Sequence, residues 1–402
     1  MADEVAQRTD GDGAVWRPAL SGLCACLIGI GLARFAYTPL IPALIEAEWF
    51  TASQAFYLGA ANLAGYLAGA LLAAPMAAWR SPVAMLRIMM LIATVSFFAC
   101  AFPLSFLWFF LWRFLSGYAG GALMVLAAST VLSAVPRSRR GLAGGVIFTG
   151  VGLGIIASGT LVPLVLQAGL VEIWFTLGFL ALALTVFAWR GWPAGAVIPA
   201  ATISRSVLER ASGFPLRALY VSYGLNAVGL VAHMVFLVDF VARGRGAGLE
   251  TASWYWIVFG AGALIGAALS GRLADRIGFP WALRATVLLQ ALAVSLVAVT
   301  DSSGWLVVSS FVVGASVPGV VPLVAGRVHE LVPDRAELHC KAWGIATTAF
   351  AIGQAAAGYG FSYLFTQTGG SYAALFAVGA AALWLALILE FAAALVARPG
   401  RS

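Results

Sequence analysis

Two arginines stand inside long apolar runs, where a charge needs a specific partner. Arg34 lies in GIGLARFAYTPLIPAL (Gly29 to Leu44), and Arg113 lies in FLWFFLWRFLSGYAGGA. If both runs are membrane-spanning helices, a rise of ~1.5 Å per residue places the two arginines ~16 Å and ~12 Å below the outer surface. A charge at that depth is costly unless it is paired or hydrated. In the same half of the chain no acidic residue lies in the interior of a predicted span, because Glu46, Glu48 and Glu172 stand at outer ends. The two arginines, at similar depth, should share a water-accessible cavity.

A guanidinium binds a carboxylate or phosphate through two parallel hydrogen bonds. The two arginines therefore predict an anionic substrate, and a small organic acid in particular. Arg113 has an alternative role, which is to bond helix-end carbonyls or a neighbouring amide and so to order the bundle. Tyr37, Asn62 and Gln354 are further predicted substrate-binding residues, although amides also join membrane helices to one another.

The apolar run after Phe214 carries Tyr223, Asn226 and His233 on one helical face. His233 follows Arg34 by 199 residues, which places it near the symmetry-related position if the chain is a repeat. We expect Asn226 and His233 to bind substrate and His233 to accept a coupling proton. The alternative is a neutral histidine that is hydrogen-bonded inside the bundle. Asp239 is a second proton-coupling candidate, which either pairs with an arginine when an outer gate closes or lies in the outer loop.

The remaining candidate groups do not predict a cofactor, a metal or a catalytic site. Glu390 is expected to reach the membrane interface, and His329 and His339 are expected in a solvated charged loop. The four cysteines lack the spacing of a metal site or a disulfide framework. The glycines between Gly150 and Gly154 imitate a dinucleotide fingerprint, but no strand precedes them. We therefore predict that the chain is not an enzyme.

The amino-acid composition indicates that lipid, not water, surrounds most of the chain. Of 402 residues, 62% are hydrophobic and 10% are charged, against roughly 45–50% and about 25% in soluble domains. This excludes a soluble enzyme, a secreted disulfide scaffold and a nucleic-acid-binding protein. Apolar stretches of about 20 residues are long enough to cross a bilayer. Twelve are predicted, at 18–45, 53–78, 83–103, 105–133, 141–167, 171–190, 214–241, 251–272, 281–300, 304–332, 341–366 and 371–397.

Positive charges give the orientation of these spans. Of the 23 Lys and Arg residues, only Arg34 and Arg113 lie well inside spans, and Arg243 and Arg245 lie in one predicted outer loop. All the others fall in the N-terminal tail or in inner segments when the N-terminus is placed inside. The positive-inside rule then predicts that both ends of the chain are cytoplasmic.

The two halves of the chain repeat one another. Gly145, Thr149, Gly154 and Gly159 recur 199 residues later as Gly344, Thr348, Gly353 and Gly358. Gly65, Gly69, Leu86 and Arg87 recur 197 residues later as Gly262, Gly266, Leu283 and Arg284. Such repeats predict two six-helix bundles related by a pseudo-twofold axis along the membrane normal, with the substrate site between them.

These motifs resemble the major facilitator superfamily along the whole membrane-embedded length. GRLADRIG resembles its inner-loop motif and implies gating roles for Gly271, Asp275, Arg276 and Gly278. RFLSGYAGGA resembles its motif in the fourth helix, and GIGLARFAYTPLIPAL resembles the bacterial YbfB/YjiJ-like branch. Two positions depart from the superfamily pattern. Ala78 stands where the second half has Asp275, and Ile155 stands where an antiporter motif carries a Gly-Pro pair.

The sequence thus predicts an all-α membrane protein with twelve transmembrane helices. It divides into a cytoplasmic tail (1–17), an N-terminal bundle (18–190), a linker (191–213), a C-terminal bundle (214–397) and a tail (398–402). We expect a monomeric secondary transporter in the bacterial inner membrane that moves a small anionic solute by alternating access with protons. The alternative is an efflux transporter for amphipathic drug-like compounds. The expected partners are the solute, protons and the lipid bilayer.

Overall fold

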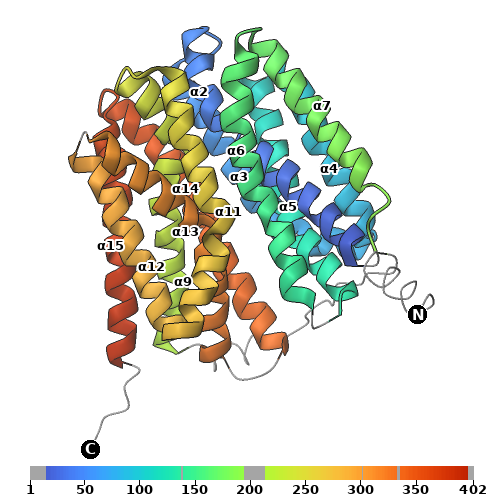
Figure 1. Cartoon of the computed structure of the whole chain (residues 1–402), viewed down its shortest axis with the longest axis vertical. Coiled ribbons are helices and arrows are strands. Elements are labelled where there is room, and N and C mark those ends of the chain that lie inside the picture. The colour runs from blue at the N-terminus through green and yellow to red at the C-terminus, as the bar shows by residue number, and fades with distance from the viewer. Residues whose placement is uncertain (1–14, 137–138, 194–212, 301, 333–335, 397–402) are drawn as a thin grey trace, which may run out of the picture. The chain divides into compact units, whose positions relative to one another are not determined.

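The computed structural model describes residues 15–136, 139–193, 213–300, 302–332 and 336–396, and every regular element within these ranges is a helix (Figure 1). Residues 1–14 of the predicted N-terminal tail, residues 194–212 of the predicted linker and the C-terminal tail (398–402) lie outside the described residues. The all-α prediction is confirmed.

Twelve helices lie in the described ranges, each within about five residues of a predicted span. Six come from the first half of the chain: Val15–Glu46, α3 (Ala52–Trp79), α4 (Pro82–Cys100), α5 (Phe106–Ala134), α6 (Arg140–Leu166) and α7 (Leu170–Ala188). Six come from the second half: Phe214–Gly244, α11 (Gly248–Ile277), α12 (Phe279–Val299), α13 (Ser303–Leu331), α14 (Ala336–Gln367) and α15 (Tyr372–Val396). Eleven are long and apolar enough to cross a membrane. The helix outside that set is α14, which is rich in Gly, Thr and polar residues.

The first helix of each half is irregular, and we refer to these as helix 1 (Val15–Glu46) and helix 7 (Phe214–Gly244). Helix 1 contains the π-helix η1 (Leu27–Leu32), a turn, and α2 (Tyr37–Glu46). Helix 7 consists of α9 (Phe214–Val231), η3 (Ala232–Phe236), α10 (Leu237–Asp239) and η4 (Phe240–Gly244), of which η3 and η4 are π-helices. π-Helical turns are rare in proteins and often occur at functional sites.

Local sequence explains where several helices begin. The hydroxyl of Ser81 accepts a hydrogen bond from the amide of Ala84 at 3.1 Å, and Pro82 follows it as the first helical residue of α4. The hydroxyl of Ser105 accepts from the amide of Trp108 in the same way at the start of α5. Both are N-caps, because each side chain satisfies an amide that has no partner within its helix.

The helices form two compact units. Unit 1 comprises Met1–Tyr37 and Ala64–Ala200, and unit 2 comprises Thr38–Leu63 and Ala201–Ser402. Within unit 2, the Thr38 hydroxyl donates to the carbonyl of Met234 in helix 7. The rings of Phe56 and Phe365 lie 4.8 Å apart. These contacts explain why segment 38–63 groups with the second half of the chain.

The internal repeat is confirmed by an equivalent helix crossing in each unit. In unit 1, Gly65 and Gly69 of α3 face the backbone of α5 between Phe114 and Tyr118. In unit 2, Gly262 and Gly266 of α11 face the backbone of α13 between Phe311 and Ala315. Gly262 follows Gly65, and Gly266 follows Gly69, by the same 197 residues. Glycine is required because a Cβ at any of the four would overlap backbone atoms of the other helix.

Candidate functional site

Arg34 lies where helix 1 is interrupted. The amides of Ala33 and Phe35 donate to carbonyls five residues back, at Ile28 and Ile30, instead of four. Pro39 adds to the irregularity because it has no amide hydrogen for the carbonyl of Phe35. Gly31, three residues before Arg34, faces the backbone of Gly150 and Gly154 in α6, which holds this part of helix 1 against unit 1.

Two aromatic rings pack against the guanidinium of Arg34, and two of its three nitrogens form no hydrogen bond within the described ranges. Its central carbon lies 5.1 Å from the ring centroid of Tyr66 and 5.5 Å from that of Phe35. Its Nε and Nη2 atoms are buried and have no hydrogen-bond partner within the described ranges. Buried charged donors without acceptors are strongly unfavourable. Arg34 is therefore the group in unit 1 that best fits the predicted anion-binding role.

Arg113 in α5 has a different environment. Its Nη1 donates to the carbonyl of Ala33 at 2.8 Å, and its central carbon lies 4.1 Å from the ring centroid of Tyr37. The side chain is 2% exposed. Arg113 thus contacts the interruption of helix 1 from α5, which agrees with its alternative, structural role. The predicted residue Tyr37 contacts Arg113 through its ring.

His233 faces the interior of unit 2. Its Nε2 lies 2.8 Å from the hydroxyl of Ser309 in α13, and that hydroxyl donates to the carbonyl of Ala293 in α12. Because the one hydrogen of the Ser309 hydroxyl goes to Ala293, Nε2 of His233 is protonated and donates to Ser309. Nδ1 is buried without an acceptor in the described part of the chain. A charged imidazolium would place a second donor there, so this geometry favours the neutral histidine.

Three predicted amides are also buried. Asn226 in helix 7 donates from Nδ2 to Oε1 of Gln290 in α12 at 2.7 Å. Gln354 in α14 lies 3.8 Å from the sulfur of Met234, and its Oε1 atom has no hydrogen-bond partner among the described residues. Asn62 is 1% exposed. Helix 7 therefore directs Asn226 and His233 toward α12 and α13, whereas Gln354 approaches helix 7 from α14.

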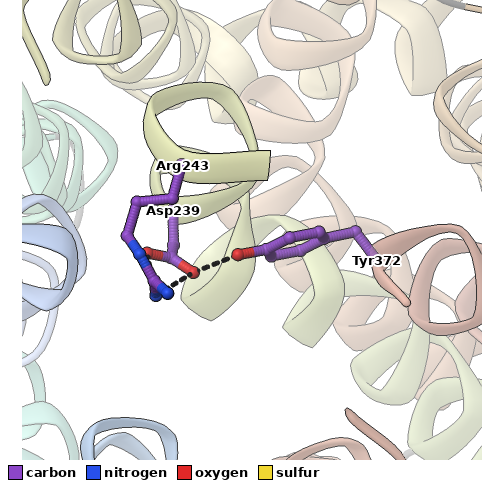
Figure 2. A network of polar contacts seen from close by, with 3 residues as sticks. All are labelled: Asp239, Arg243 and Tyr372. Carbon is purple, nitrogen blue, oxygen red and sulfur yellow. Dashed lines mark hydrogen bonds and ion pairs between the residues drawn. The ribbon is translucent and has the colours of Figure 1, made fainter. Parts of the chain in front are cut away.

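Asp239 lies at the centre of the polar network in Figure 2. Its carboxylate is fully buried and accepts a short hydrogen bond from the hydroxyl of Tyr372 at the start of α15. It also accepts from Nη1 of Arg243, at 3.3 and 3.4 Å. Arg243 belongs to helix 7, which continues to Gly244, beyond the predicted end of the span. The spacing of four residues could have indicated this ion pair from the sequence, but the contribution of Tyr372 had no local signal.

The predicted gating motif lies at the junction of α11 and α12. Asp275 and Arg276 are exposed in the last turn of α11. Gly278 has φ 78°, a conformation that favours glycine, and its amide donates to the carbonyl of Ala274 at 2.8 Å. A Cβ added at Gly271 would contact no neighbouring atom, so this glycine is not needed for close packing. The structure thus explains Gly278 by turn geometry and leaves Asp275 and Arg276 accessible.

The sequence-based expectations for Glu390 and for the position of His233 are wrong. Glu390 does not reach the interface, because it is 3% exposed and accepts a hydrogen bond from the Ser222 hydroxyl at 2.6 Å. His233 is also not equivalent to Arg34. Gly224 occupies in unit 2 the position of Gly31 in unit 1, facing Ala349 and Gly353 of α14.

The register of helix 7 relative to helix 1 follows from the glycines that face each other in the two units. Gly353 follows Gly154 by 199 residues, but Gly224 follows Gly31 by only 193 residues. Helices 1 and 7 therefore have a shorter offset than α6 and α14. This register makes Ala227 the counterpart of Arg34.

His329 and His339 lie where α13 ends and α14 begins. Their rings stack with centroids 4.2 Å apart. His329 is exposed, but His339 is buried within α14, so the expectation of a solvated charged loop is wrong for His339. Among the described residues, no group of three or more histidine, cysteine or acidic side chains is placed to hold a metal ion.

Comparison with solved structures shows the fold. A crystal structure of a D-xylose-proton symporter superposes with a TM-score of 0.74, at 14% identity, over 94% of this chain and 97% of the other. A crystal structure of a single-residue mutant of the nucleoside transporter NupG also gives 0.74, at 16% identity, over 96% of this chain and 100% of the other. No curated protein sequence that was compared is significantly similar.

A family model provides the assignment at the level of sequence. It is described as "Uncharacterised MFS-type transporter YbfB" and matches residues 26–391. The match includes helix 1 from Cys26 onward and ends within α15, so it covers Arg34, Arg113, Asp239 and the gating motif. The chain therefore belongs to this family of major facilitator superfamily transporters and is a multi-pass membrane protein with their fold.

Proposed function

We propose that this protein is a proton-coupled secondary transporter that moves a small organic anion by alternating access. The family match supports transport, and the environment of Arg34 supports the class of solute. The distribution of Lys and Arg supports cytoplasmic termini, and the resemblance of helix 1 to the bacterial YbfB/YjiJ-like branch supports a bacterial inner membrane. The gating role of Asp275 and Arg276 also belongs to this proposal, since both are exposed at the end of α11.

The guanidinium of Arg34, whose Nε and Nη2 atoms are buried in a partly exposed side chain, is the observation that carries the proposal. Two of its nitrogens lack acceptors in the described ranges, while Tyr66 and Phe35 cover it with ring faces. Aromatic faces stabilise the cation but accept no in-plane hydrogen bonds. A carboxylate arriving in the guanidinium plane would fill the vacant donors without displacing either ring.

Of the two proton-coupling candidates, Asp239 fits the role better than His233. His233 is already hydrogen-bonded to Ser309 inside unit 2, and its Nδ1 has no acceptor in the described ranges for a second proton. Asp239 is partnered by Tyr372 and by Arg243, whose side chain is 30% exposed. Protonation of Asp239 would weaken its attraction to Arg243, which couples proton uptake to a change at the end of helix 7.

The test uses purified protein and solutes of different charge. A thermal-shift panel of organic acids and neutral amphipathic compounds identifies solutes that stabilise the folded state. Uptake of the stabilising solutes into proteoliposomes then measures transport. Arg34→Ala should reduce uptake of an organic acid by about 30-fold or more, the cost of truncating one partner of a buried charged pair.

The controls separate loss of the site from loss of the fold. Arg80→Ala removes an exposed arginine in the connection between α3 and α4 and should leave uptake unchanged. Arg34→Lys keeps the charge but loses the bidentate geometry, so it should retain partial uptake. Unchanged uptake of acids by Arg34→Ala contradicts the proposed anion site. Transport of neutral amphipathic compounds alone would favour the efflux alternative.

A further inference from the structure

A pocket opens at one end of unit 2, and Arg34 is not among the residues that line it. Its volume is about 380 Å³, which suits a small organic molecule. The lining includes Ser53, Arg243, Phe365, Thr366, Gly370 and Tyr372. The sequence predicts that this end faces the outside, because the loop after helix 7 belongs to the outer side.

The pocket is built by a tight turn and an aromatic wall. The chain passes from α14 to α15 through Gly369 and Gly370, with φ 64° and 93°. Tyr372 then packs its ring against Phe365 and Phe240, with centroids 5.0 and 5.5 Å apart. The turn at Gly369 and Gly370 and the packed ring of Tyr372 therefore shape the pocket.

Arg243 presents a partly used guanidinium to this pocket. Only Nη1 forms hydrogen bonds within the described ranges, and both are long and directed to Asp239. The carboxylate of Asp239 is fully buried, whereas the arginine side chain is 30% exposed. The positive group is thus the accessible member of this ion pair, whose contacts are drawn in Figure 2.

Hydroxyl groups provide further donors at the rim. The hydroxyl of Thr366 donates to the carbonyl of Ser362, so the hydroxyl of Ser53, 3.0 Å away, is the donor to Thr366. Rotation of the Ser53 side chain would redirect its hydrogen into the pocket. A planar cation with a nearby hydroxyl donor is suited to oxygen anions.

We propose that this pocket is a second anion site, in which Arg243 binds an oxyanion in competition with Asp239. The oxyanion is the carboxylate of a soluble acid or the phosphate of a lipid headgroup. Binding brings a second negative charge to Arg243, so it strengthens when Asp239 takes up a proton. Affinity therefore rises as pH falls.

Several other groups surround Asp239. Tyr372 donates to it from α15, and Glu46 at the end of α2 is the other carboxylate close enough to act on it electrostatically. Helix α11 packs against α10 and η4 and carries Glu250, which is exposed, in its first turn. Glu46 carries the same charge as the Asp239 carboxylate, whereas Arg243 carries the opposite charge.

The site is tested with trifluoroacetate, a carboxylate that stays ionised over the whole pH range and is observed by ¹⁹F NMR. Line broadening during titration of the purified protein in neutral detergent, at about pH 5 and about pH 8, measures its affinity. The titration is repeated in Arg34→Ala, and the binding that survives there is assigned to the pocket. Because Arg34 is absent in this variant, the measured binding does not depend on the proposed transport site.

When it is added to the Arg34→Ala variant, Arg243→Gln should weaken trifluoroacetate binding by about tenfold or more, because the bidentate donor is lost. Asp239→Asn should bind about fivefold more tightly at the higher pH and lose the pH dependence, because the competing charge is gone. Arg245→Gln is the matched control: it removes the same charge two residues away and should bind as the parent does.

Addition of phosphatidylglycerol to the detergent distinguishes the two sources of the oxyanion. Displacement of trifluoroacetate by this lipid, with the effect absent in Arg243→Gln, assigns the site to a headgroup. Retention of trifluoroacetate assigns it to a soluble acid. Equal affinity in Arg243→Gln and in its parent would overturn the proposal. An unchanged pH dependence in Asp239→Asn would overturn the competition between Asp239 and the anion.

Discussion

Helix 1 and helix 7 begin the two repeats, and both contain π-helical turns, yet their polar residues have different partners. In helix 1, Arg34 has buried donors without acceptors in the described part of the chain. In helix 7, Asn226, His233 and Asp239 each form a hydrogen bond to a neighbouring helix of unit 2. A repeated scaffold therefore carries different chemistry in its two halves, because close packing constrains the glycines and leaves the polar positions free to differ.

The largest expected effect is a difference in stability between the two arginines of unit 1. Arg113→Leu should destabilise the fold by about 2–4 kcal/mol, since it removes a charge-assisted hydrogen bond and a cation–π contact. Arg34→Leu should leave stability unchanged or raise it by about 1 kcal/mol, because buried donors without acceptors are removed. Thermal unfolding of both variants in the same detergent measures the difference. Equal destabilisation would show that Arg34 is a structural residue.

A smaller effect is expected from the glycines that hold helices 1 and 7. A Cβ at Gly31 would lie 2.8 Å from both the carbonyl oxygen of Gly150 and the Cα of Gly154. Gly31→Ala should therefore cost about 2 kcal/mol through overpacking. At Gly224 the nearest atom is the carbonyl oxygen of Ala349 at 3.2 Å. Gly224→Ala should cost less than about 1 kcal/mol, partly offset by the higher helix propensity of alanine.

Unfolding measurements on both glycine variants would check this contrast between the repeats. If Gly224→Ala proved the more destabilising, the closer helix approach at Gly31 would not decide the cost of an added Cβ.

The smallest effect concerns the internal hydrogen bond of His233. Ser309→Ala should cost roughly 1–2 kcal/mol, because Nε2 of His233 and the carbonyl of Ala293 lose their partner. Ser310→Ala is the matched control, since that hydroxyl bonds the carbonyl of Leu306 in its own helix. It should change stability by less than about 0.5 kcal/mol. Equal effects of the two substitutions would remove the evidence that His233 is anchored inside unit 2.

Most of the fold could be predicted from the sequence, because eleven of the twelve described helices are long apolar runs and lipid requires their backbones to be satisfied locally. The glycine crossings were also predictable from the offset of 197 residues between Gly65 and Gly262. The register of helices 1 and 7 was not, since their offset differs by six residues from that of α6 and α14. Counting from one helix pair therefore misplaced His233.

The partners of the polar residues depended on contacts between distant segments. Arg34 and Arg113 look alike in sequence, because both are single charges among apolar residues. One carbonyl, that of Ala33, distinguishes them in the structure. Tyr372 lies 133 residues from Asp239, and Ser222 lies 168 residues from Glu390, so no local pattern could indicate either contact.

The sequence by itself determined that lipid surrounds the chain, how many helices it forms and that its two halves repeat. Hydropathy and the length of apolar runs are local properties of the chain, and the glycine spacing reflects close packing of helices. Only the tertiary structure decided which buried charges have partners. A hydrogen bond depends on the positions of two atoms, and those positions follow from how helices far apart in the chain pack together.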